Sequence, residues 1–337
     1  MKSKLTRRTF IKQSSFTLTA LALPFPLLKF SKLDPMTAKN TFEIIIIGGS
    51  YSGLSAGMTL GRALREVLII DSGKPCNSQT PHSHNFITQD GKTPNEIATS
   101  AKLQVEQYAT VKFHNGFATS AQKTPEGFEI TTQNNTKFRA KKLIFATGVK
   151  DIMLNIKGFS ECWGISVIHC PYCHGYEVKH EQTGILANGD IAFHYAQLII
   201  NWTKKLTIFT NGKSTLTPQQ TEKIKTHNIQ IIEKEISALN HKDGHLKDIV
   251  FTDQSTFQLK AIYARPAFKQ HTDIPEQLGC EFTEQGHIKV DMFQKTTAEN
   301  VFACGDNASP FRAVSHAVAA GTVAGAMVNN EMTVKEF

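Results

Sequence analysis

Residues 169–177, HCPYCHGYE, hold the most reactive group of side chains in this sequence. Cys170 and Cys173 stand two residues apart, with His169 before the pair and His174 directly after it. Such a group fits three kinds of site: half of a zinc site, a redox-active dithiol, or a structural disulfide. Each kind of site requires different partner residues elsewhere in the chain.

The zinc and structural alternatives find little support elsewhere in the chain. A zinc site needs further ligands at suitable spacing, and the remaining cysteines form no second CxxC pair: Cys76, Cys162, Cys280 and Cys304. Cys304 lies inside an apolar run and is interpreted as a buried core thiol. A disulfide across so short a loop stabilises little, although disulfides are common in exported proteins. We expect no metal site, and a redox pair is favoured.

Residues 42–71 are typical of a strand–turn–helix–strand unit that binds dinucleotides. FEIIIIG (42–48) is a continuous β-branched run, as in a strand buried on both faces of a parallel sheet. Glycine and serine at 49–53 predict a turn, and residues 54–64 have apolar residues at helical spacing. VLIID (67–71) predicts a second buried strand that ends in an acid.

The turn of this unit carries an imperfect glycine fingerprint. Gly48 permits the tight turn and Gly53 lets the helix pack on the strand, but Ser50 stands where the central glycine would let a diphosphate approach. The helix that begins near Ser52 offers free N–H groups to the diphosphate. Asp71 is placed to accept hydrogen bonds from an adenosine ribose. We therefore expect dinucleotide binding here.

A second segment, NVFACGD (300–306), brings Gly305 and Asp306 to the end of a predicted strand. A carboxylate there can hold the polyol chain of a flavin. The N-terminus of the alanine-rich helix that follows (313–328) can face the electron-rich part of the flavin ring. The alternative is a strand end with a capping aspartate.

The remaining predicted strands indicate one domain interrupted by another. KLIFATG (142–148) is a buried strand, and a second strand–turn–helix–strand unit runs from TGILAN (183–188) to LTIFTNG (206–212). The fold class is α/β, with two doubly wound Rossmann-like nucleotide-binding domains, the second inserted into the first. The predicted domains are residues 40–150 plus 270–330, and residues 155–265.

Together these segments resemble the thioredoxin-reductase-like flavoproteins. The resemblance extends from about residue 42 to 328 and rests on GGSYSGLSAG (48–57), ID-SG-P-N (70–77), ATG (146–148), CPYCHGYE (170–177) and NVFACGD, in this order. It implies an FAD domain interrupted by a smaller NADPH domain. The FAD contacts that it implies are Gly48, Gly49, Ser50, Ser52, Gly53, Asp71, Asn85, Gly305, Asp306 and Ala313.

By the same resemblance, Cys170 and Cys173 form a redox pair carried by the inserted domain. Cys173 faces the flavin, and Cys170 is the thiol that exchanges with the substrate. A CxxC pair lowers the pKa of one thiol, so that a thiolate is available for exchange. Typical thioredoxin reductases follow the pair with an acid, whereas this chain has His174, whose ring can take and return protons near neutral pH. His169 is a weaker candidate, because a histidine beside a cysteine is often structural.

The second dinucleotide turn departs from the family pattern. It reads ANGDIA (187–192), with Ala187 in place of the first glycine. The segment after the next strand, FTNGKS (209–214), has neither paired arginines for a 2′-phosphate nor an acid for an NAD ribose, and Lys213 is its one basic residue. We expect the fold to persist here, with NADPH the weaker of the two cofactor expectations.

These features lead to a functional hypothesis with two alternatives. Relatives with a CxxC–His arrangement resemble dithiol oxidases, in which thiols reduce the pair, the pair reduces FAD, and oxygen reoxidises FAD to give hydrogen peroxide. We therefore expect an FAD-dependent thiol–disulfide oxidoreductase whose preferred direction is thiol oxidation. The nearest alternative is an NADPH-dependent thioredoxin or disulfide reductase. An alternative of another class is a non-catalytic flavin-binding protein with a static disulfide.

The first 36 residues are typical of a leader. Paired arginines in TRRTFIK (6–12) precede a short apolar run (16–30), a pattern that predicts export to the periplasm by the twin-arginine (Tat) pathway. A membrane anchor or a basic tail is the alternative, but Pro24 and Pro26 make the run a poor transmembrane helix.

Charge limits the partners. The 337 residues carry a formal charge of +8, of which +6 falls in residues 1–36 and only +2 on the rest. Nothing in this pattern supplies a basic face, so we expect no nucleic acid. The expected partner is a small dithiol or a protein thiol or disulfide. Membrane contact is expected only through an uncleaved leader, and the resemblance allows a homodimer.

Overall fold

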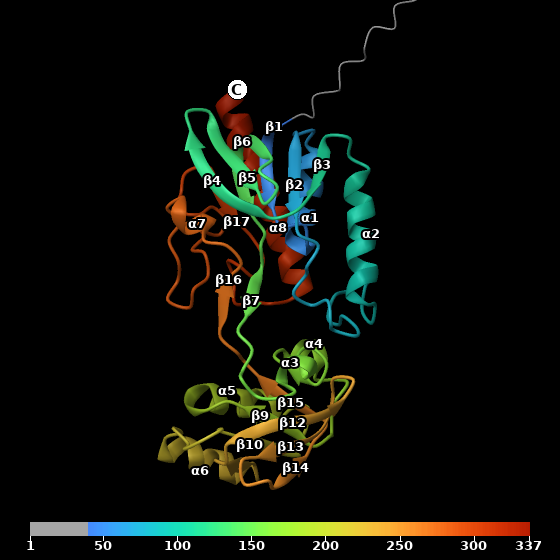
Figure 1. Ribbon diagram of the computed structural model, residues 1–337, viewed down its shortest axis with the longest axis vertical. Coiled ribbons are helices and arrows are strands. Elements are labelled where there is room, and N and C mark those ends of the chain that lie inside the picture. The colour runs from blue at the N-terminus through green and yellow to red at the C-terminus, as the bar shows by residue number, and fades with distance from the viewer. Residues whose placement is uncertain (1–39) are drawn as a thin grey trace, which may run out of the picture. The chain divides into compact units, whose positions relative to one another are not determined.

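The computed structural model describes residues 40–337, which form two main sheets and the helices that cover them (Figure 1). The predicted leader, residues 1–36, lies outside the described residues. Between residues 40 and 337, no helix combines the length and the apolar character needed to cross a membrane.

The larger sheet has seven strands in the order β3-β2-β1-β6-β5-β4, with β17 paired to β6. Five strands run parallel: β1 (Thr41–Ile47), β2 (Val67–Asp71), β3 (Val111–Asn115), β6 (Lys137–Phe145) and β17 (Val301–Ala303). β5 (Gly127–Thr132) pairs antiparallel with β6, and β4 (Ala118–Thr124) pairs antiparallel with β5 as the edge of the sheet. Because β17 comes from the end of the chain, segments far apart in sequence complete one sheet.

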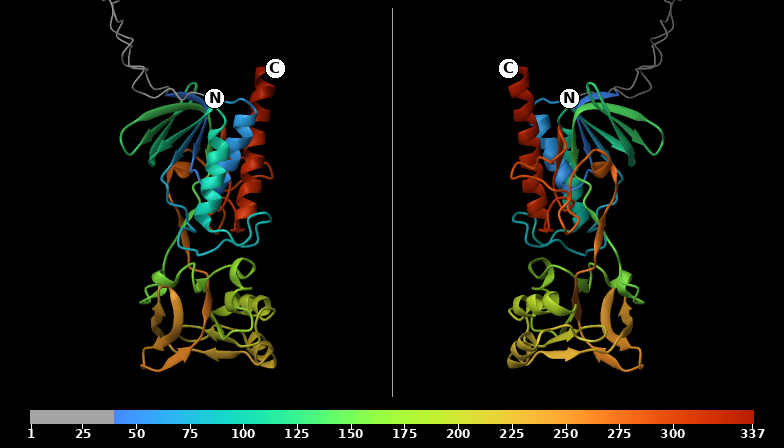
Figure 2. Two further views of the ribbon diagram at one scale, coloured as in Figure 1. Left: turned by 90° about the vertical axis from the view of Figure 1, so that its right-hand side faces the viewer. Right: turned by 90° about the vertical axis from the view of Figure 1, so that its left-hand side faces the viewer.

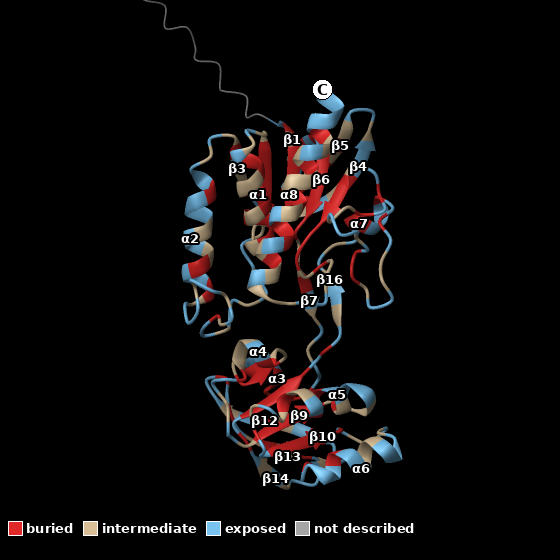
Figure 3. Cartoon of the chain, turned by 180° about the vertical axis from the view of Figure 1, so that it is seen from behind, coloured by how far each residue is buried: buried red, intermediate tan, exposed pale blue. Residues whose placement is uncertain are grey.

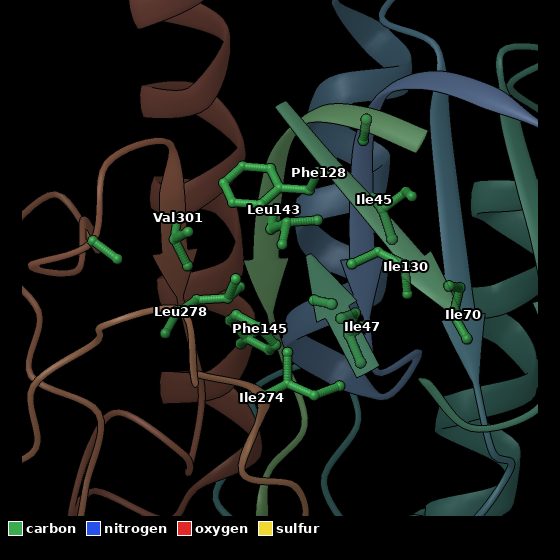
Figure 4. Close-up of a cluster of buried hydrophobic side chains, with 14 of the residues drawn as sticks. Ile45, Ile47, Ile70, Phe128, Ile130, Leu143, Phe145, Ile274, Leu278 and Val301 are labelled. Atoms are coloured by element: carbon green, nitrogen blue, oxygen red, sulfur yellow. The ribbon is translucent and has the colours of Figure 1, made fainter. Parts of the chain in front are cut away.

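Successive residues of β1 face opposite sides of this sheet, which explains its unbroken apolar sequence. Ile44 and Ile46 belong to a core that includes residues of helices α1 (Tyr51–Arg62) and α8 (Val314–Glu336). Ile45 and Ile47 pack into a second core with Phe128, Phe145 and Ile274 (Figure 4). Helices α1, α8 and α2 (Pro94–Glu106) cover one face of the sheet (Figure 2).

Helices α1 and α8 differ in length from their predicted ranges. Helix α1 begins at Tyr51, one residue before the predicted start near Ser52, and ends at Arg62, two residues before the predicted apolar pattern ends. Helix α8 continues past 328 to Glu336, because its last turns still make contacts: Met332 is buried and Glu331 pairs with Lys142 at 2.6 Å. The apolar pattern that predicted this helix ends at residue 328, because polar contacts help to hold the last turns.

The smaller sheet is entirely parallel, in the order β11-β10-β9-β15-β8. Its strands are β8 (Val167–Ile168), β9 (Thr183–Leu186), β10 (Leu206–Phe209), β11 (Gln230–Ile232) and β15 (Ala261–Ala264). Helices α5 (Gly189–Ile199) and α6 (Pro218–Thr226) follow β9 and β10, and buried side chains line both faces of the sheet (Figure 3). A three-stranded antiparallel sheet lies beside it, of β12 (Ile236–Lys242), β13 (His245–Phe251) and β14 (Thr256–Gln258).

Two short strands lie on the connections between the larger and smaller sheets. β7 (Val149–Asp151) follows the larger sheet, and β16 (Phe268–Gln270) leads back to it from β15. They pair antiparallel. The remaining helices are short: α3 (Phe159–Cys162), α4 (Pro171–His174) and α7 (Ile274–Gln277). The predicted α/β fold with Rossmann-like sheets is confirmed, whereas the predicted domain boundaries stay predictions.

Candidate active site

Cys170 and Cys173 form a disulfide at the start of α4. Cys170 is the residue before the helix, and Pro171 takes the first helical position, where its missing N–H is no loss. The backbone N–H of Cys173 donates to Cys170 Sγ at 3.2 Å. When the pair is reduced, the same N–H would stabilise a thiolate on Cys170. The geometry therefore suits Cys170 as the exchanging thiol.

His174, the candidate base, is the last residue of α4 and directly follows Cys173. Burial lowers the pKa of His174 because it disfavours the charged ring; Glu177 raises the pKa and His84 lowers it. An imidazole that is neutral near pH 7 can accept a proton from a thiol. The chemistry expected of His174 thus agrees with its surroundings.

His169 has different surroundings. Its ring stacks on Trp163 with 5.9 Å between centroids, and its Nε2 is buried without a hydrogen-bond partner among the described residues. Burial lowers the pKa of His169 to about 3. A ring that stays neutral throughout the working pH range moves no protons, so the structure favours a packing role for His169.

The turn between β1 and α1 keeps its helix N-terminus open. Gly49 N–H donates to Asp71 Oδ1 at 3.0 Å, and a Cβ on Gly49 would lie 2.7 Å from Asp71 Cβ. Ser50, the residue before α1, makes no side-chain cap, so the first N–H groups of α1 are free for an anion. Glycine at 49 and an uncapped helix together fit the diphosphate and ribose of a dinucleotide.

The segment between β17 and α8 meets this turn. A Cβ on Gly305 would lie 2.6 Å from Ser52 Oγ, so only glycine allows this approach. Asp306 follows, and burial raises the pKa of its carboxyl although Arg312 opposes the shift. Ala313 precedes α8 and makes no side-chain cap either. A buried carboxylate and a second open helix N-terminus fit a flavin polyol and ring.

The predicted FAD residues therefore fall into two groups that the structure brings together. One group lies on the β1–α1 turn and at the end of β2, and the other on the β17–α8 segment. Asn85 belongs to neither segment: it is exposed in the loop before α2, where its N–H donates to Asp90 Oδ1 at 2.8 Å. The contact of Asn85 with FAD stays a prediction. Cys304 is fully buried, and burial raises its pKa to about 12, as expected for a core thiol.

The turn between β9 and α5 is closed by the protein itself. Asn188 caps α5: its Oδ1 accepts from Gly189 N–H at 2.9 Å and from Thr215 N–H at 2.8 Å, and its Nδ2 donates to Lys213 O at 2.9 Å. A Cβ on Gly189 would lie 2.9 Å from Thr215 Oγ1. The loop 213–215 is therefore tied over the start of the helix.

The first turn of α5 also carries a negative charge. Asp190 lies there, and its Oδ1 accepts a hydrogen bond from Gln220 Nε2 at 2.7 Å. A carboxylate at this position repels phosphate. Lys213, the one basic residue of the following segment, is tied through its carbonyl to Asn188. These contacts add to the departure at Ala187 and make the turn a poor nucleotide site.

Two features of the site were not expected from the sequence. His84 Nε2 lies 3.5 Å from Glu177 Oε1, at the end of the HCPYCHGYE motif. Arg312 forms a two-bond ion pair with Asp151 of β7, at 2.7 and 2.9 Å. The partners are far apart in sequence, and the HSHN run at 82–85 was the one available signal for the first pair.

Comparison with known proteins adds independent evidence. The chain matches the pyridine nucleotide-disulphide oxidoreductase family over residues 42–321. Thioredoxin reductase tcpT of Claviceps purpurea is 31% identical over 312 residues, which cover 88% of this chain and 96% of the relative. Thioredoxin reductase sirT of Leptosphaeria maculans is 30% identical over 310 residues, 87% of this chain and 95% of the relative.

A solved structure agrees in fold. An oxidoreductase from Agrobacterium tumefaciens superposes with a TM-score of 0.82 and 36% identity, covering 87% of this chain and 99% of that one. The fold, the disulfide and the β1–α1 turn thus indicate the same protein family. The chain belongs to the pyridine nucleotide-disulphide oxidoreductase family, as a thioredoxin reductase-like FAD-dependent disulfide oxidoreductase.

Proposed function

We propose that this protein oxidises dithiols at Cys170–Cys173 and that oxygen is the final electron acceptor. Family membership supports the coarser part, FAD-dependent thiol–disulfide exchange. The observation that carries the direction is the closed β9–α5 turn, where Asn188 and Thr215 cover the helix N-terminus that would bind a nicotinamide dinucleotide. With that entry closed, electrons enter the protein from thiols.

The side chains account for the exchange steps. His174 takes a proton from one substrate thiol, and the thiolate attacks Cys170 Sγ and breaks the disulfide, which leaves a Cys173 thiolate. His174 then releases that proton to water and takes the proton of the second substrate thiol, which attacks the mixed disulfide, so the oxidised substrate leaves and Cys170 is released as a thiolate. The substrate has then lost two electrons and two protons.

FAD would be held by the β1–α1 turn, Asp71 and the β17–α8 segment. When bound, it accepts the electron pair of the reduced cysteines and passes it to oxygen, which with two protons becomes hydrogen peroxide. The residues of this chain hold it in place: Gly49 and the open end of α1 for the diphosphate, Asp71 for the ribose, and Asp306 for the polyol.

The reductase alternative has support of its own. The curated relatives compared above are named thioredoxin reductases, which favours NADPH-dependent reduction of thioredoxin or another disulfide over thiol oxidation. In that case the loop 213–215 has to leave the start of α5, breaking the hydrogen bonds of Asn188 to Lys213 and Thr215.

Anaerobic mixing separates the two directions. The FAD-loaded protein is mixed with NADPH and, separately, with dithiothreitol, while the flavin absorbance is followed. We expect rapid bleaching by the dithiol and none by NADPH. Rapid bleaching by NADPH would overturn the oxidase proposal. Bleaching by neither, with no free thiols appearing on mild reduction, would support the non-catalytic alternative with a static disulfide.

The location and the substrate are part of this proposal. Export by the Tat pathway agrees with electron entry from thiols, because a periplasmic enzyme has no access to cytoplasmic NADPH. A small dithiol or a protein thiol is the proposed substrate. Cell fractionation with an antibody against residues 40–337 tests the location, and a purely cytoplasmic signal would contradict it.

A further inference from the structure

Arg312, on the segment that leads into α8, contacts two carboxylates in different ways. Its two terminal NH groups donate to Asp151 of β7, Nη1 to Oδ1 at 2.7 Å and Nη2 to Oδ2 at 2.9 Å. Its Nε lies 3.6 Å from Asp306 Oδ2, too far for a hydrogen bond, and has no hydrogen-bond partner among the described residues. One guanidinium is thus bound to one acid and only faces the other, and thiol exchange at the cysteine pair assigns this arrangement no role.

The pair of Arg312 and Asp151 is largely shielded from water. The side chain of Asp151 is 4% exposed and that of Arg312 is 16% exposed. Two parallel, charge-assisted hydrogen bonds fit the planar guanidinium to the planar carboxylate. Because an arginine stays charged in proteins, removal of its acid would leave a buried charge in need of another partner. Among the described residues, Asp306 is the one other acid that forms an ion-pair contact with Arg312.

The carboxylate of Asp306 has acceptor capacity to spare. Its Oδ2 faces Arg312 Nε at 3.6 Å and Cys76 Sγ at 4.0 Å, and the described residues give this carboxylate no shorter hydrogen bond or ion pair. An ionised carboxylate can accept about four hydrogen bonds. Asp306 is also the acid assigned to the flavin polyol, whose hydroxyl groups are donors. A tight ion pair with Arg312 would compete with the polyol for the same oxygens.

Contacts of β7 and β16 fix Asp151 relative to Asp306. Asp151 lies opposite Phe268 in the β7–β16 ladder. Gln270, two residues further along β16, donates from Nε2 to the carbonyl of Asn307 at 3.0 Å, and Asn307 directly follows Asp306. The two acids therefore keep their places without the arginine, so that loss of one contact moves the guanidinium and not the acids.

We propose that Asp151 is a positioning residue for the FAD site. By holding both terminal NH groups of Arg312, it keeps the guanidinium from closing on Asp306 and leaves that carboxylate open to the flavin polyol. The inference rests on the polyol contact proposed for Asp306, and not on the direction of thiol exchange or on oxygen as acceptor. Asp151 acts through Arg312 and is not itself a ligand of FAD.

Removing the acid, and then the arginine as well, should change FAD affinity in opposite directions. In Asp151→Asn, Arg312 loses its partner and pairs with Asp306, so FAD affinity should fall roughly tenfold or more. Adding Arg312→Gln removes the group that closes the site, so the double variant should bind FAD within about threefold of the native protein. An ion pair that only stabilises the fold would give no such recovery of FAD affinity in folded protein.

A third variant keeps every charge and tests the geometry of the pair. Arg312→Lys replaces the two-bond guanidinium by a single ammonium, which Asp151 holds less firmly and which therefore pairs with Asp306 for part of the time. FAD affinity should fall about three- to tenfold. Because no charge is lost, this variant should fold even if Asp151→Asn does not.

The measurement is a flavin fluorescence titration of each variant after removal of FAD, with urea unfolding of the same samples as a second readout. Unfolding separates loss of the fold from loss of FAD affinity. In an Asp306→Asn background, Asp151→Asn should have no further effect on FAD affinity, because the carboxylate that the arginine would close on is absent.

Glu331→Gln is the matched control. It removes the acid of another ion pair with a buried cation, in which Glu331 Oε2 lies 2.6 Å from Lys142 Nζ. Glu331 lies on α8, eighteen residues after Ala313, which is about 27 Å along the helix axis. This variant should lose stability in urea and keep the FAD affinity of the native protein.

The outcomes separate this inference from the proposed function. Weaker FAD binding in Asp151→Asn and Arg312→Lys, with recovery in the double variant, supports the role of Asp151. Unchanged FAD affinity in either folded single variant, or a double variant as weak as Asp151→Asn, would overturn it and leave thiol oxidation untouched, because flavin reduction by dithiothreitol in the native protein decides that function. A native protein that binds no FAD would overturn both.

Discussion

The two nucleotide-type turns of this protein share one strand–turn–helix architecture but differ at the N-terminus of the helix. Each leads from a buried parallel strand into a helix, β1 into α1 and β9 into α5. The N-terminus of α1 has no side-chain cap, and Asp71 stands beside its turn. The N-terminus of α5 is capped by Asn188, covered by Thr215 and followed by Asp190.

Under the proposed function, the fold persists at the β9–α5 turn while its nucleotide site is lost. A helix leaves its first N–H groups unpaired, and either a ligand or the protein must satisfy them. At α5, Asn188 satisfies one of these groups, the N–H of Gly189, and holds loop 213–215 at the start of the helix, which makes phosphate binding there less favourable. At α1, Ser50 makes no such cap, so the first N–H groups of the helix remain available to an anion. The comparison therefore supports the proposal that FAD binds at the β1–α1 turn and that the β9–α5 turn binds no nicotinamide dinucleotide.

The largest effect should come from closing the open turn. Gly49→Val places a side chain against Asp71, where even a Cβ would lie only 2.7 Å from Asp71 Cβ. We expect at least a hundredfold loss of FAD affinity, measured by flavin fluorescence on titrating the apoprotein. The matched variant in the other turn, Gly189→Ala, should leave FAD affinity unchanged.

Gly189→Ala is expected to cost stability alone. Gly189 has a φ of +55°, which strains a residue with a Cβ, and that Cβ would lie 2.9 Å from Thr215 Oγ1. The cost should be about 1 kcal/mol, read from urea unfolding. Equal loss of FAD affinity in both glycine variants would contradict the proposal that FAD binds at the β1–α1 turn alone.

Much of this picture follows from the sequence, for a physical reason. Strand burial and turn chemistry are local, so the apolar run at 42–48 and the terminal Asp71 predicted the first unit, and Cys304 was predicted to be buried. For the closure of the second turn, the one signal within the turn itself was Ala187, which replaces the first glycine of the fingerprint. Its main contacts, Asn188 to residues 213–215, and the His84–Glu177 pair join residues that lie apart in sequence, and chain spacing alone does not predict such contacts.

Substitution of the cysteines should have distinct effects at the open turn. Cys170→Ser should stop substrate turnover while the flavin spectrum stays that of the native protein, because Cys170 meets the substrate. Cys173→Ser should change the flavin absorbance, because the family resemblance implies that Cys173 faces the flavin ring. Visible spectra of the oxidised variants and assays with dithiothreitol give both answers. Identical spectra would contradict the division of roles.

A smaller effect concerns pH and the segment that meets the open turn. Burial raises the pKa of Asp306 in the folded protein. The folded state then holds this proton to a higher pH than the unfolded state does, so stability falls as the pH rises from the unfolded to the folded pKa of Asp306. Asp306→Asn removes this pH-dependent contribution to the free energy of unfolding. Just above the unfolded pKa of an aspartate, urea stability should fall less or rise more with pH in the apoprotein variant than in the native apoprotein; an unchanged slope would contradict the burial argument.

The smallest effect tests the cap of the closed turn. Asn188→Ala removes the bonds that tie loop 213–215 to α5. The loss of a helix cap should cost about 1 kcal/mol, seen as a decrease of about 2–4 °C in the thermal midpoint. Thr93→Ala at the start of α2, which removes the cap of a helix that packs on the larger sheet, is the control. Only Asn188→Ala should increase NADPH binding; an increase in neither would weaken the closure argument.

One measurement tests the central claim most directly: oxygen uptake and peroxide formation by the FAD-loaded protein in air, with a dithiol as the sole electron donor. The account predicts one molecule of hydrogen peroxide for each dithiol oxidised, with no change on adding NADPH. No oxygen uptake with the dithiol, together with NADPH consumption when a disulfide is supplied, would contradict it and establish the reductase direction.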